Sequence, residues 1–314
     1  MERGHTQDYI SNLSMDLIGH ALETGQYKAF PVYQRNIERR EPPFAHGEYA
    51  PCAIAILLLT SGLDYHLARL KYLRDLYRHS PPLPHTPYFN WKIGDSLFSK
   101  VSKLLWKRTE RRLREQVIEL TVVRDSVAHP KLYLVKQTWK ADDTVAEHRA
   151  RISEGAEHRA KTVERKLKRS EKTRSLHLPL VPTWLSYVDL VVCVLVLTRF
   201  INLIEGRYGN PYAWTGSFSV RNVPAGFFSD WGHVSRKSID LSAWARGFFN
   251  SLATGDQEAV HKRLGADASH YIDQKPAMSR QIRHGSIARI LKAMRNPPPP
   301  EFMRKAPPWP NAGV

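Results

Sequence analysis

The chain has 314 residues, of which 42% are hydrophobic, and its 47 Lys and Arg against 30 Asp and Glu give a formal net charge of +17. This apolar content is enough for the core of one large domain or of two ordinary ones. The positive charge favours a polyanionic partner, because each phosphate that Lys or Arg neutralises releases counterions. Nucleic acid is the first choice, and an acidic membrane face or a protein partner is the alternative.

The cysteines and the N-terminal segment exclude several other classes. Cys52 and Cys193 lie among apolar neighbours, which predicts buried core residues in a reducing compartment, with neither a disulfide framework nor metal spacing. Residues 1–12 have no apolar signal core, and the longest apolar run, residues 190–197, is too short to cross a bilayer. We therefore predict a cytoplasmic soluble protein that uses no metal, no cofactor and no membrane.

The first part of the chain predicts two helices and a connector. Residues 6–27 carry apolar residues at helical spacing, and we expect Gly25 to end this helix. Residues 30–43 form a basic connector that closes on a Pro-Pro break. A long helix follows over residues 48–77, and its first half is apolar on nearly all faces. That pattern predicts a helix in the middle of a bundle.

A second long helix is predicted over residues 95–128, after a proline-rich loop at residues 80–91 whose aromatic residues should pack on the bundle. A break near Thr109 would divide this helix into two, and the sequence leaves that open. Its middle is strongly basic. We therefore take Arg111, Arg112 and Arg114 as candidate contacts for a phosphate backbone.

The end of this helix carries the most informative residues. Its apolar stripe runs to Val127, and Pro130 should end the helix near His129. Asp125 and His129 lie four residues apart on one face, and Arg124 is offset from His129 by about 140°. Asp125 can thus orient or charge His129 while Arg124 faces the same groove from its edge.

The stretch from Arg124 to His129, RDSVAH, resembles the signature of the HEPN superfamily. In that family an arginine, a polar residue and a histidine four to six residues after the arginine close a core helix. The resemblance implies a helical bundle that dimerises so that two copies of the motif meet and, in active members, metal-independent RNA cleavage. Arg124 and His129 correspond to the family's arginine and histidine, and Asp125 to its polar position, where asparagine is commoner.

Many HEPN-like proteins also carry an acid in an early core helix, and Asp64 stands at a comparable place. Asp64 is therefore a candidate partner of Arg124, where a buried carboxylate would fix the guanidinium for phosphate contact. The alternative is a solvated acid that binds His66 or Lys71.

Arginine and histidine at this spacing also occur by chance in a chain with 14 His. Arg74 to His79 has the same spacing and the same acid, although its basic neighbours favour a solvated or nucleic-acid-facing stripe. Residues 40–46 fit a looser form but straddle two prolines. We prefer Arg124 because its motif closes a strongly apolar helix. The alternative is an ordinary helix end whose histidine complements the helix dipole.

After the motif, residues 131–139 alternate well enough to predict a short strand, as half of a hairpin. Residues 142–174 lose the apolar periodicity and predict a charged helix or a flexible arm. Either this segment is a solvated face, or it contacts phosphates through residues such as Arg165, Lys166, Lys168 and Arg169. Residues 183–205 are apolar on most sides, which predicts the closing helix of the bundle.

The predicted fold is all-α, with an HEPN-like antiparallel helical bundle over residues 1–206 and a basic insertion at residues 140–178. Residues 207–295 predict a smaller, mostly helical C-terminal region, as an accessory lobe or as a wrap around the bundle. Its helical patterns lie at residues 239–252, 256–271 and 279–294. The proline-rich tail, residues 296–314, is expected to be extended or disordered.

Three function hypotheses follow from the sequence. The first is an HEPN-type endoribonuclease of toxin–antitoxin or antiviral defence systems, which acts on RNA as a homodimer under an antitoxin or other regulatory partner. The second is a non-catalytic RNA-binding module, and the third is a basic helical interaction protein. We favour the first because both motif residues, a polar neighbour and a strong positive charge occur together. His129 would act as general base or acid, and Arg124 would stabilise charge on the phosphate.

Overall fold

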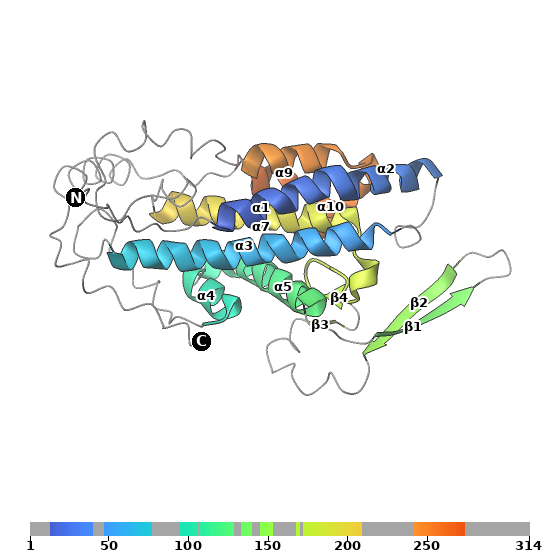
Figure 1. Ribbon diagram of the computed structural model, residues 1–314, viewed down its shortest axis with the longest axis horizontal. Coiled ribbons are helices and arrows are strands. Elements are labelled where there is room, and N and C mark those ends of the chain that lie inside the picture. The colour runs from blue at the N-terminus through green and yellow to red at the C-terminus, as the bar shows by residue number, and fades with distance from the viewer. Residues whose placement is uncertain are drawn as a thin grey trace, which may run out of the picture.

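Helices dominate the part of the chain that the structure, a computed structural model, describes. That part comprises residues 13–39, 47–76, 95–105, 107–128, 133–139, 145–152, 168–169, 172–208 and 241–273. The long helices lie side by side in a bundle, and a two-stranded hairpin extends from one end of it (Figure 1). The mostly helical character that the sequence predicts is confirmed.

The first helical stretch is longer than predicted. α1 (Leu13–Thr24), the π-helical turn η1 (Gly25–Ala29) and α2 (Phe30–Arg39) follow one another without interruption. The prediction that Gly25 ends the helix is wrong, and so is the assignment of residues 30–39 to a connector. A Cβ on Gly25 would lie 2.7 Å from the ring of Phe248 and 2.9 Å from Leu190 Cδ2. Glycine at this position therefore permits close helix packing and does not serve as a helix end.

Of the two long helices predicted over residues 48–77 and 95–128, the first is continuous and the second is divided. α3 (Tyr49–Leu76) matches the prediction for residues 48–77. The helix predicted over residues 95–128 is divided into α4 (Leu97–Leu104), the 3-10 turn η3 (Arg108–Glu110) and α5 (Arg111–Ala128). The side chain of Ser96 caps α4 by accepting a hydrogen bond from the backbone N–H of Ser99 at 3.3 Å. The break thus lies close to Thr109, where the sequence left it open.

A β-hairpin follows α5. β1 (Tyr133–Trp139) pairs antiparallel with β2 (Val145–Ile152), which confirms the predicted strand and hairpin. The prediction of a charged helix or flexible arm is wrong for residues 145–152, because they form β2. A second, very short hairpin joins β3 (Lys168–Arg169) to β4 (Lys172–Thr173).

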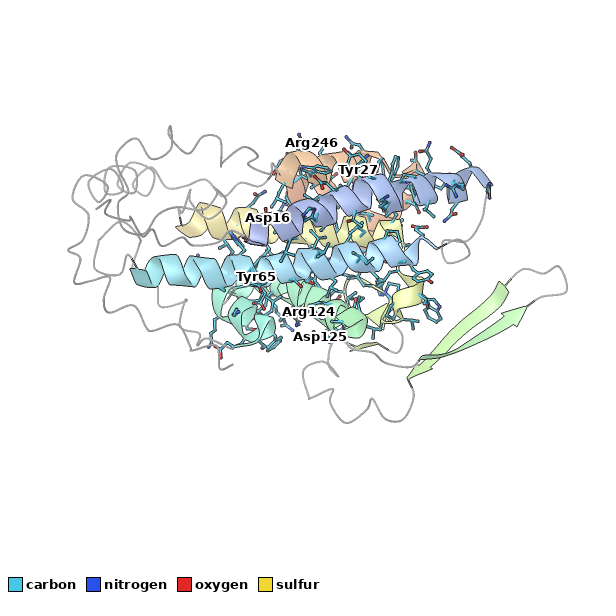
Figure 2. All side chains as sticks on the ribbon, in the orientation of Figure 1. Asp16, Tyr27, Tyr65, Arg124, Asp125 and Arg246 are labelled. Carbon is cyan, nitrogen blue, oxygen red and sulfur yellow. The ribbon has the colours of Figure 1, made fainter. Side chains whose placement is uncertain are left out.

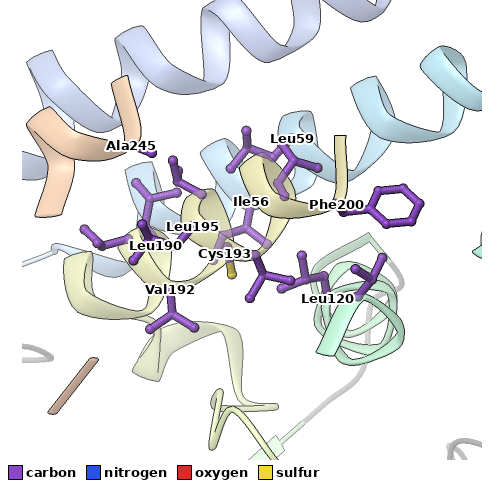
Figure 3. Close-up of a cluster of buried hydrophobic side chains, with 14 of the residues drawn as sticks. Ile56, Leu59, Leu120, Leu190, Val192, Cys193, Leu195, Phe200 and Ala245 are labelled. Carbon is purple, nitrogen blue, oxygen red and sulfur yellow. The ribbon is translucent and has the colours of Figure 1, made fainter. Parts of the chain in front are cut away.

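α7 (Tyr187–Tyr208) forms the middle of the core, after the short turn η5 (Pro182–Trp184). Figure 3 shows side chains of α3, α5 and α9 gathered around α7, and those labelled from α7 are Leu190, Val192, Cys193, Leu195 and Phe200. Cys52 and Cys193 are both free and buried, as predicted. The closing helix of the prediction is therefore present and lies at the centre of the fold.

The C-terminal helices pack on α7. α9 (Leu241–Asn250), α10 (Thr254–Leu264) and α11 (Ala268–Ile272) all contact α7 and contribute buried residues to the same core. The predicted helix at residues 256–271 is divided at Gly265, whose φ of +60° suits the end of α10. The pattern at residues 279–294, the tail at 296–314 and the loop at 80–91 lie outside the described residues.

Two core helices have the length and composition of membrane spans. They are α3 over Tyr49–Ala68 and α7 over Tyr187–Ile204, and 56% and 78% of these stretches are buried inside the bundle. We expected the longest apolar run to be too short to cross a bilayer because we counted residues 190–197 alone. The helix is apolar over a longer stretch in spite of Asp189 and Arg199. Because core helices of bundles pass the same test, the finding does not assign a location.

A buried carboxylate holds the start of α7. Glu48 is fully buried and accepts hydrogen bonds from the backbone N–H of Tyr187 and from the side-chain amide of Asn36, the latter at 3.0 Å. Burial raises the pKa of Glu48 to about 7 against the effect of these two donors, and the charges of Asp189 and Asp256 raise it further. Glu48 thus joins α2, α3 and α7 at one end of the bundle.

We expect Glu48 to make the fold less stable as the pH rises. The folded state binds its proton more tightly than the unfolded chain does, so the free energy of unfolding falls between pH 4.5 and about 7. A shift of this size corresponds to a loss of about 3 kcal/mol.

Glu48→Gln should lack this loss, because its amide has no charge to bury and can donate to Asn36 Oδ1, which has no partner among the described residues. Urea denaturation of both proteins across this pH range measures the difference. Parallel pH profiles for the two proteins would contradict the assignment.

Candidate functional site

The predicted motif lies at the C-terminal end of α5. The structure describes Arg124 and Asp125, and Figure 2 shows both at the lower surface of the bundle. Their side chains are 25% and 28% exposed, so a ligand in solvent can reach them. His129 lies just beyond the described end of α5, and its place in the site stays a prediction.

Arg124 binds its neighbour in the chain. Its Nε and Nη2 lie 2.9 Å and 2.7 Å from Asp125 Oδ1. The predicted contact between Asp125 and His129 stays a prediction, because His129 lies outside the described residues. Because a partly exposed ion pair contributes about 1 kcal/mol or less, an anionic ligand can displace Asp125 from Arg124. The arrangement is a partly exposed arginine near a helix end with an acid beside it.

Asp64 does not pair with Arg124. It accepts a hydrogen bond from Lys100 Nζ at 2.6 Å, and the Lys100 side chain is only 10% exposed. The break between α4 and α5 accounts for this difference, because it turns α4 so that Lys100 reaches α3. A nearly buried ammonium needs a carboxylate partner, and Asp64 provides it. The expected support of Arg124 by Asp64 is therefore wrong.

The three arginines at the start of α5 have different surroundings. Arg111 pairs with Glu115 at 2.9 Å, and its side chain is 71% exposed. Arg114 Nη1 donates to the carbonyl of Leu105 at 3.3 Å. The guanidinium of Arg112 lies against Gly265, within 1.6 Å of the position that a Cβ there would take. Arg112 and Arg114 thus contact other elements, although Arg112 is exposed as Arg111 is.

The other predicted phosphate contacts lie in the basic insertion. Arg165 and Lys166 fall outside the described residues. Lys168 and Arg169 form β3, for which the structure describes the backbone alone. All four stay predictions.

Sequence reasoning missed the role of Glu119. This residue of α5 is fully buried, and its carboxylate accepts hydrogen bonds from the backbone N–H groups of Ser175 at 2.7 Å and Leu176 at 2.8 Å. Burial raises the pKa of Glu119, and the two backbone donors oppose that rise. The segment that returns from the basic insertion is thereby attached to α5 about one and a half turns before Arg124. The signal was available, since an acid within the apolar run VIELTVV must find donors when the helix is buried.

Gln116 attaches the C-terminal helices to α5 one turn from Glu119. It is fully buried, its Nε2 donates to the carbonyl of Leu264 at 3.3 Å, and its Oε1 accepts from the hydroxyl of Tyr271 at 2.8 Å. The ring of Tyr271 also lies under the guanidinium of Arg199, 4.6 Å from its carbon Cζ. The helix that carries Arg124 is therefore fixed by the insertion and by α10 and α11 together.

Ser126 does not lie where the dimer hypothesis places it. In a homodimer that joins two copies of the motif helix, the small residues Ser126 and Ala128 would permit a close contact between the copies. Ser126 is buried inside its own bundle, and its hydroxyl donates to the carbonyl of Val123 at 2.7 Å. Ala128 is exposed. A contact between copies at this end must therefore use other residues than Ser126.

Comparison of the chain with models of protein families, with curated proteins and with solved structures gives no significant match. The fold and the site rest on the residues and contacts described above. The residues that resemble the HEPN signature therefore support a proposal and not a family assignment.

Replacing Glu119 by alanine should destabilise the fold strongly. The buried N–H of Leu176 and the partly buried N–H of Ser175 would lose their acceptor, at a cost of about 2 to 4 kcal/mol. Glu115→Ala is the matched control on the same helix, because Glu115 pairs with Arg111 at the surface. We expect it to change the free energy of unfolding by about 0.5 kcal/mol or less. Urea denaturation gives both values, and an equal effect of the two substitutions would refute the role of Glu119.

Proposed function

We propose that the protein is a metal-independent endoribonuclease of the HEPN type that acts in the cytoplasm. One observation carries the proposal: Arg124 and Asp125 lie together, partly exposed, near the end of a helix whose middle, residues 116–123, is buried, and His129 directly follows this helix in the chain. Rigid placement on a core helix suits a site that must hold one phosphate group. The net charge of +17 supports a polyanionic substrate.

The proposed reaction uses the ribose 2′-hydroxyl of the substrate as its nucleophile. The 2′-oxygen forms a bond to the adjacent phosphorus, and the bond from phosphorus to the 5′-oxygen of the next nucleotide breaks. His129 takes the proton of the 2′-hydroxyl or gives one to the leaving 5′-oxygen, because imidazole titrates near neutrality. The products are a 2′,3′-cyclic phosphate and a 5′-hydroxyl, and no cofactor is needed.

Arg124 stabilises the charge that develops on the non-bridging oxygens. A guanidinium is always charged and can donate two parallel hydrogen bonds to a phosphate. Before RNA binds, Asp125 occupies the Nε and Nη2 donors of Arg124 and holds the side chain at the end of α5. Exchange of Asp125 for a phosphate oxygen would place the same two donors on the substrate.

The same ion pair favours a second candidate function. If Asp125 keeps Arg124 engaged, the site holds RNA without cleaving it, and the protein is a non-catalytic RNA-binding module. The first candidate, the nuclease, acts in toxin–antitoxin or antiviral defence, where an antitoxin or another regulatory partner restrains it. The two candidates differ in whether Arg124 and His129 are needed for turnover.

Substitution of either motif residue should abolish RNA cleavage. We expect Arg124→Ala and His129→Ala to lower the cleavage rate by a factor of about 10² to 10⁴, the range measured for charge-stabilising and acid–base groups. Arg35→Ala is the control and should keep the wild-type rate, because Arg35 is an exposed arginine of α2 outside the proposed site. Wild-type activity should persist in EDTA, and DNA should not be cut.

The readout is gel analysis of RNA after incubation with each purified protein. Equal cleavage by the wild type and His129→Ala would remove His129 from the mechanism and would make Arg74 and His79 the next candidates. RNA binding without any cleavage by the wild type would favour the non-catalytic module.

We further propose that the active form is an isologous homodimer. An in-line displacement needs a base on one side and an acid on the other, and a second copy supplies the second histidine and arginine. Ile54 and Tyr65 are each 52% exposed, and both lie on α3, which packs against α5. Their separation of eleven residues places them about 20° apart around the helix, hence on one face. This exposed apolar face of α3, defined by Ile54 and Tyr65, replaces Ser126 as the candidate contact.

Charge placed on this face should separate the copies. We expect Tyr65→Glu to give a monomer by light scattering and to lose RNA cleavage with it. Tyr27→Glu is the matched control, since Tyr27 is 68% exposed on the separate helical stretch that Figure 2 shows. A monomeric wild type at active concentrations would contradict the dimer, as would full activity in a mixed dimer with one His129→Ala subunit.

A further inference from the structure

The β1–β2 hairpin follows the motif helix directly, and the chain returns to the same helix further on. Residues 129–132 alone separate the end of α5 from β1. On the return path, Ser175 and Leu176 are bound to Glu119 of α5. The two attachment points lie on either side of Arg124 along α5. Figure 1 shows the hairpin extending away from the bundle beyond this end of α5.

The strand register separates charged from uncharged residues. On one face of the hairpin, Lys136 stands opposite Arg149, Leu134 opposite Arg151, and Thr138 opposite Glu147. On the other face, Tyr133 stands opposite Ile152, Val135 opposite Ala150, and Gln137 opposite His148. Residues alternate between the faces of a strand, so every Lys, Arg, Asp and Glu of β1 and β2 falls on the same face. That face has an excess of positive charge.

The backbone register places like charges opposite each other on this face. Lys136 and Arg149 are directly opposite each other, and like charges in that position destabilise a sheet. A hairpin of two strands is marginally stable by itself in water. β1 and β2 contact each other extensively, but their contacts with the other described elements are slight. An anion on this face would offset the repulsion.

We propose that the charged face of the β1–β2 hairpin binds the phosphate backbone of RNA next to the motif and so acts as a substrate arm. Arg149 and Arg151 are two residues apart on one strand, hence about 7 Å apart, which lets each meet a different phosphate of one RNA strand. The choice of RNA among polyanions rests on the proposed function. The binding surface itself rests on the register and on the attachment of the hairpin to α5.

Removal of the opposed pair should weaken RNA binding without harming the fold. In a His129→Ala background, which prevents cleavage, the double substitution Lys136→Gln and Arg149→Gln is compared with the same background alone. The probe is a fluorescent RNA hairpin titrated at several salt concentrations. We expect at least tenfold weaker binding, and a slope of log affinity against log salt that is flatter by about 0.7 to 0.9 for each phosphate that the variant no longer neutralises.

Two exposed arginines of α2 provide the matched control. Arg35→Gln with Arg39→Gln removes the same charge from another part of the surface and should leave the slope unchanged. Equal denaturation curves show that both variants fold. An unchanged slope in the hairpin variant would overturn the arm. A selective loss of binding to phosphatidylserine vesicles, with RNA binding intact, would overturn it in favour of a membrane surface.

A cleavage assay separates this inference from the proposed function. With the native His129, the hairpin substitutions should raise KM for RNA and leave kcat unchanged. If the parent binds RNA without cleaving it and the hairpin variant loses that binding, the arm stands and the nuclease proposal fails. If the parent cleaves RNA and the variant has an unchanged KM, the arm fails and the nuclease proposal stands. A parent that binds no RNA refutes both.

Discussion

Buried polar side chains need hydrogen-bond partners, and this requirement organises the structure around α5. Gln116 and Glu119 lie one turn apart on this helix, both without exposed surface. A polar group in such a place costs several kcal/mol unless it is hydrogen-bonded. The partners come from distant parts of the chain: the carbonyl of Leu264 for Gln116, and the N–H groups of Ser175 and Leu176 for Glu119. Satisfying two side chains therefore brings the C-terminal helices and the root of the insertion to the helix that carries Arg124.

The same principle operates at the start of α7. Asp189 accepts hydrogen bonds from the N–H and the hydroxyl of Ser186, and Ser186 in turn accepts from the N–H of Asp189, which is a reciprocal cap. The other carboxylate oxygen of Asp189, Oδ1, accepts a hydrogen bond from Arg263 Nη1 of α10 at 2.7 Å. Together with Glu48, two carboxylates thus stand at the positive end of the α7 dipole. An acid of the turn before α3, an acid of α7 and a cation of α10 hold the start of the central helix, which apolar side chains surround.

Periodicity in the sequence was sufficient for the helices that are apolar over a long stretch. α3 and α7 have the predicted bounds within a few residues, because their hydrophobic runs can be buried only as helices of a bundle. Gly25 misled the prediction, because its role is to admit the ring of Phe248 from a segment more than two hundred residues away. No local pattern carries that information.

The place of Arg124 and Asp125 in the fold was predictable, but the contacts of the candidate site were not. The sequence predicted that Arg124 and Asp125 lie near a helix end, because the apolar stripe runs to Val127 and Pro130 should end the helix. Both side chains are partly exposed there. The partner of Asp64 was not predictable, because it depends on the break that turns α4 and brings Lys100 to α3. The donors to Glu119 are backbone N–H groups, which every residue except proline carries, so the sequence could indicate a buried acid but not its partner.

The claim that the end of α5 cleaves RNA by attack of the 2′-hydroxyl is tested most directly by the chemistry of the product ends. A defined RNA that is cut at a mapped position is compared with the same RNA carrying a single 2′-deoxy nucleotide on the 5′ side of that bond. The account predicts that the parent RNA yields a 2′,3′-cyclic phosphate and a 5′-hydroxyl by mass spectrometry, and that the deoxy substitution abolishes the cut. Cleavage at the deoxy position, or products with a 3′-hydroxyl and a 5′-phosphate, would contradict it.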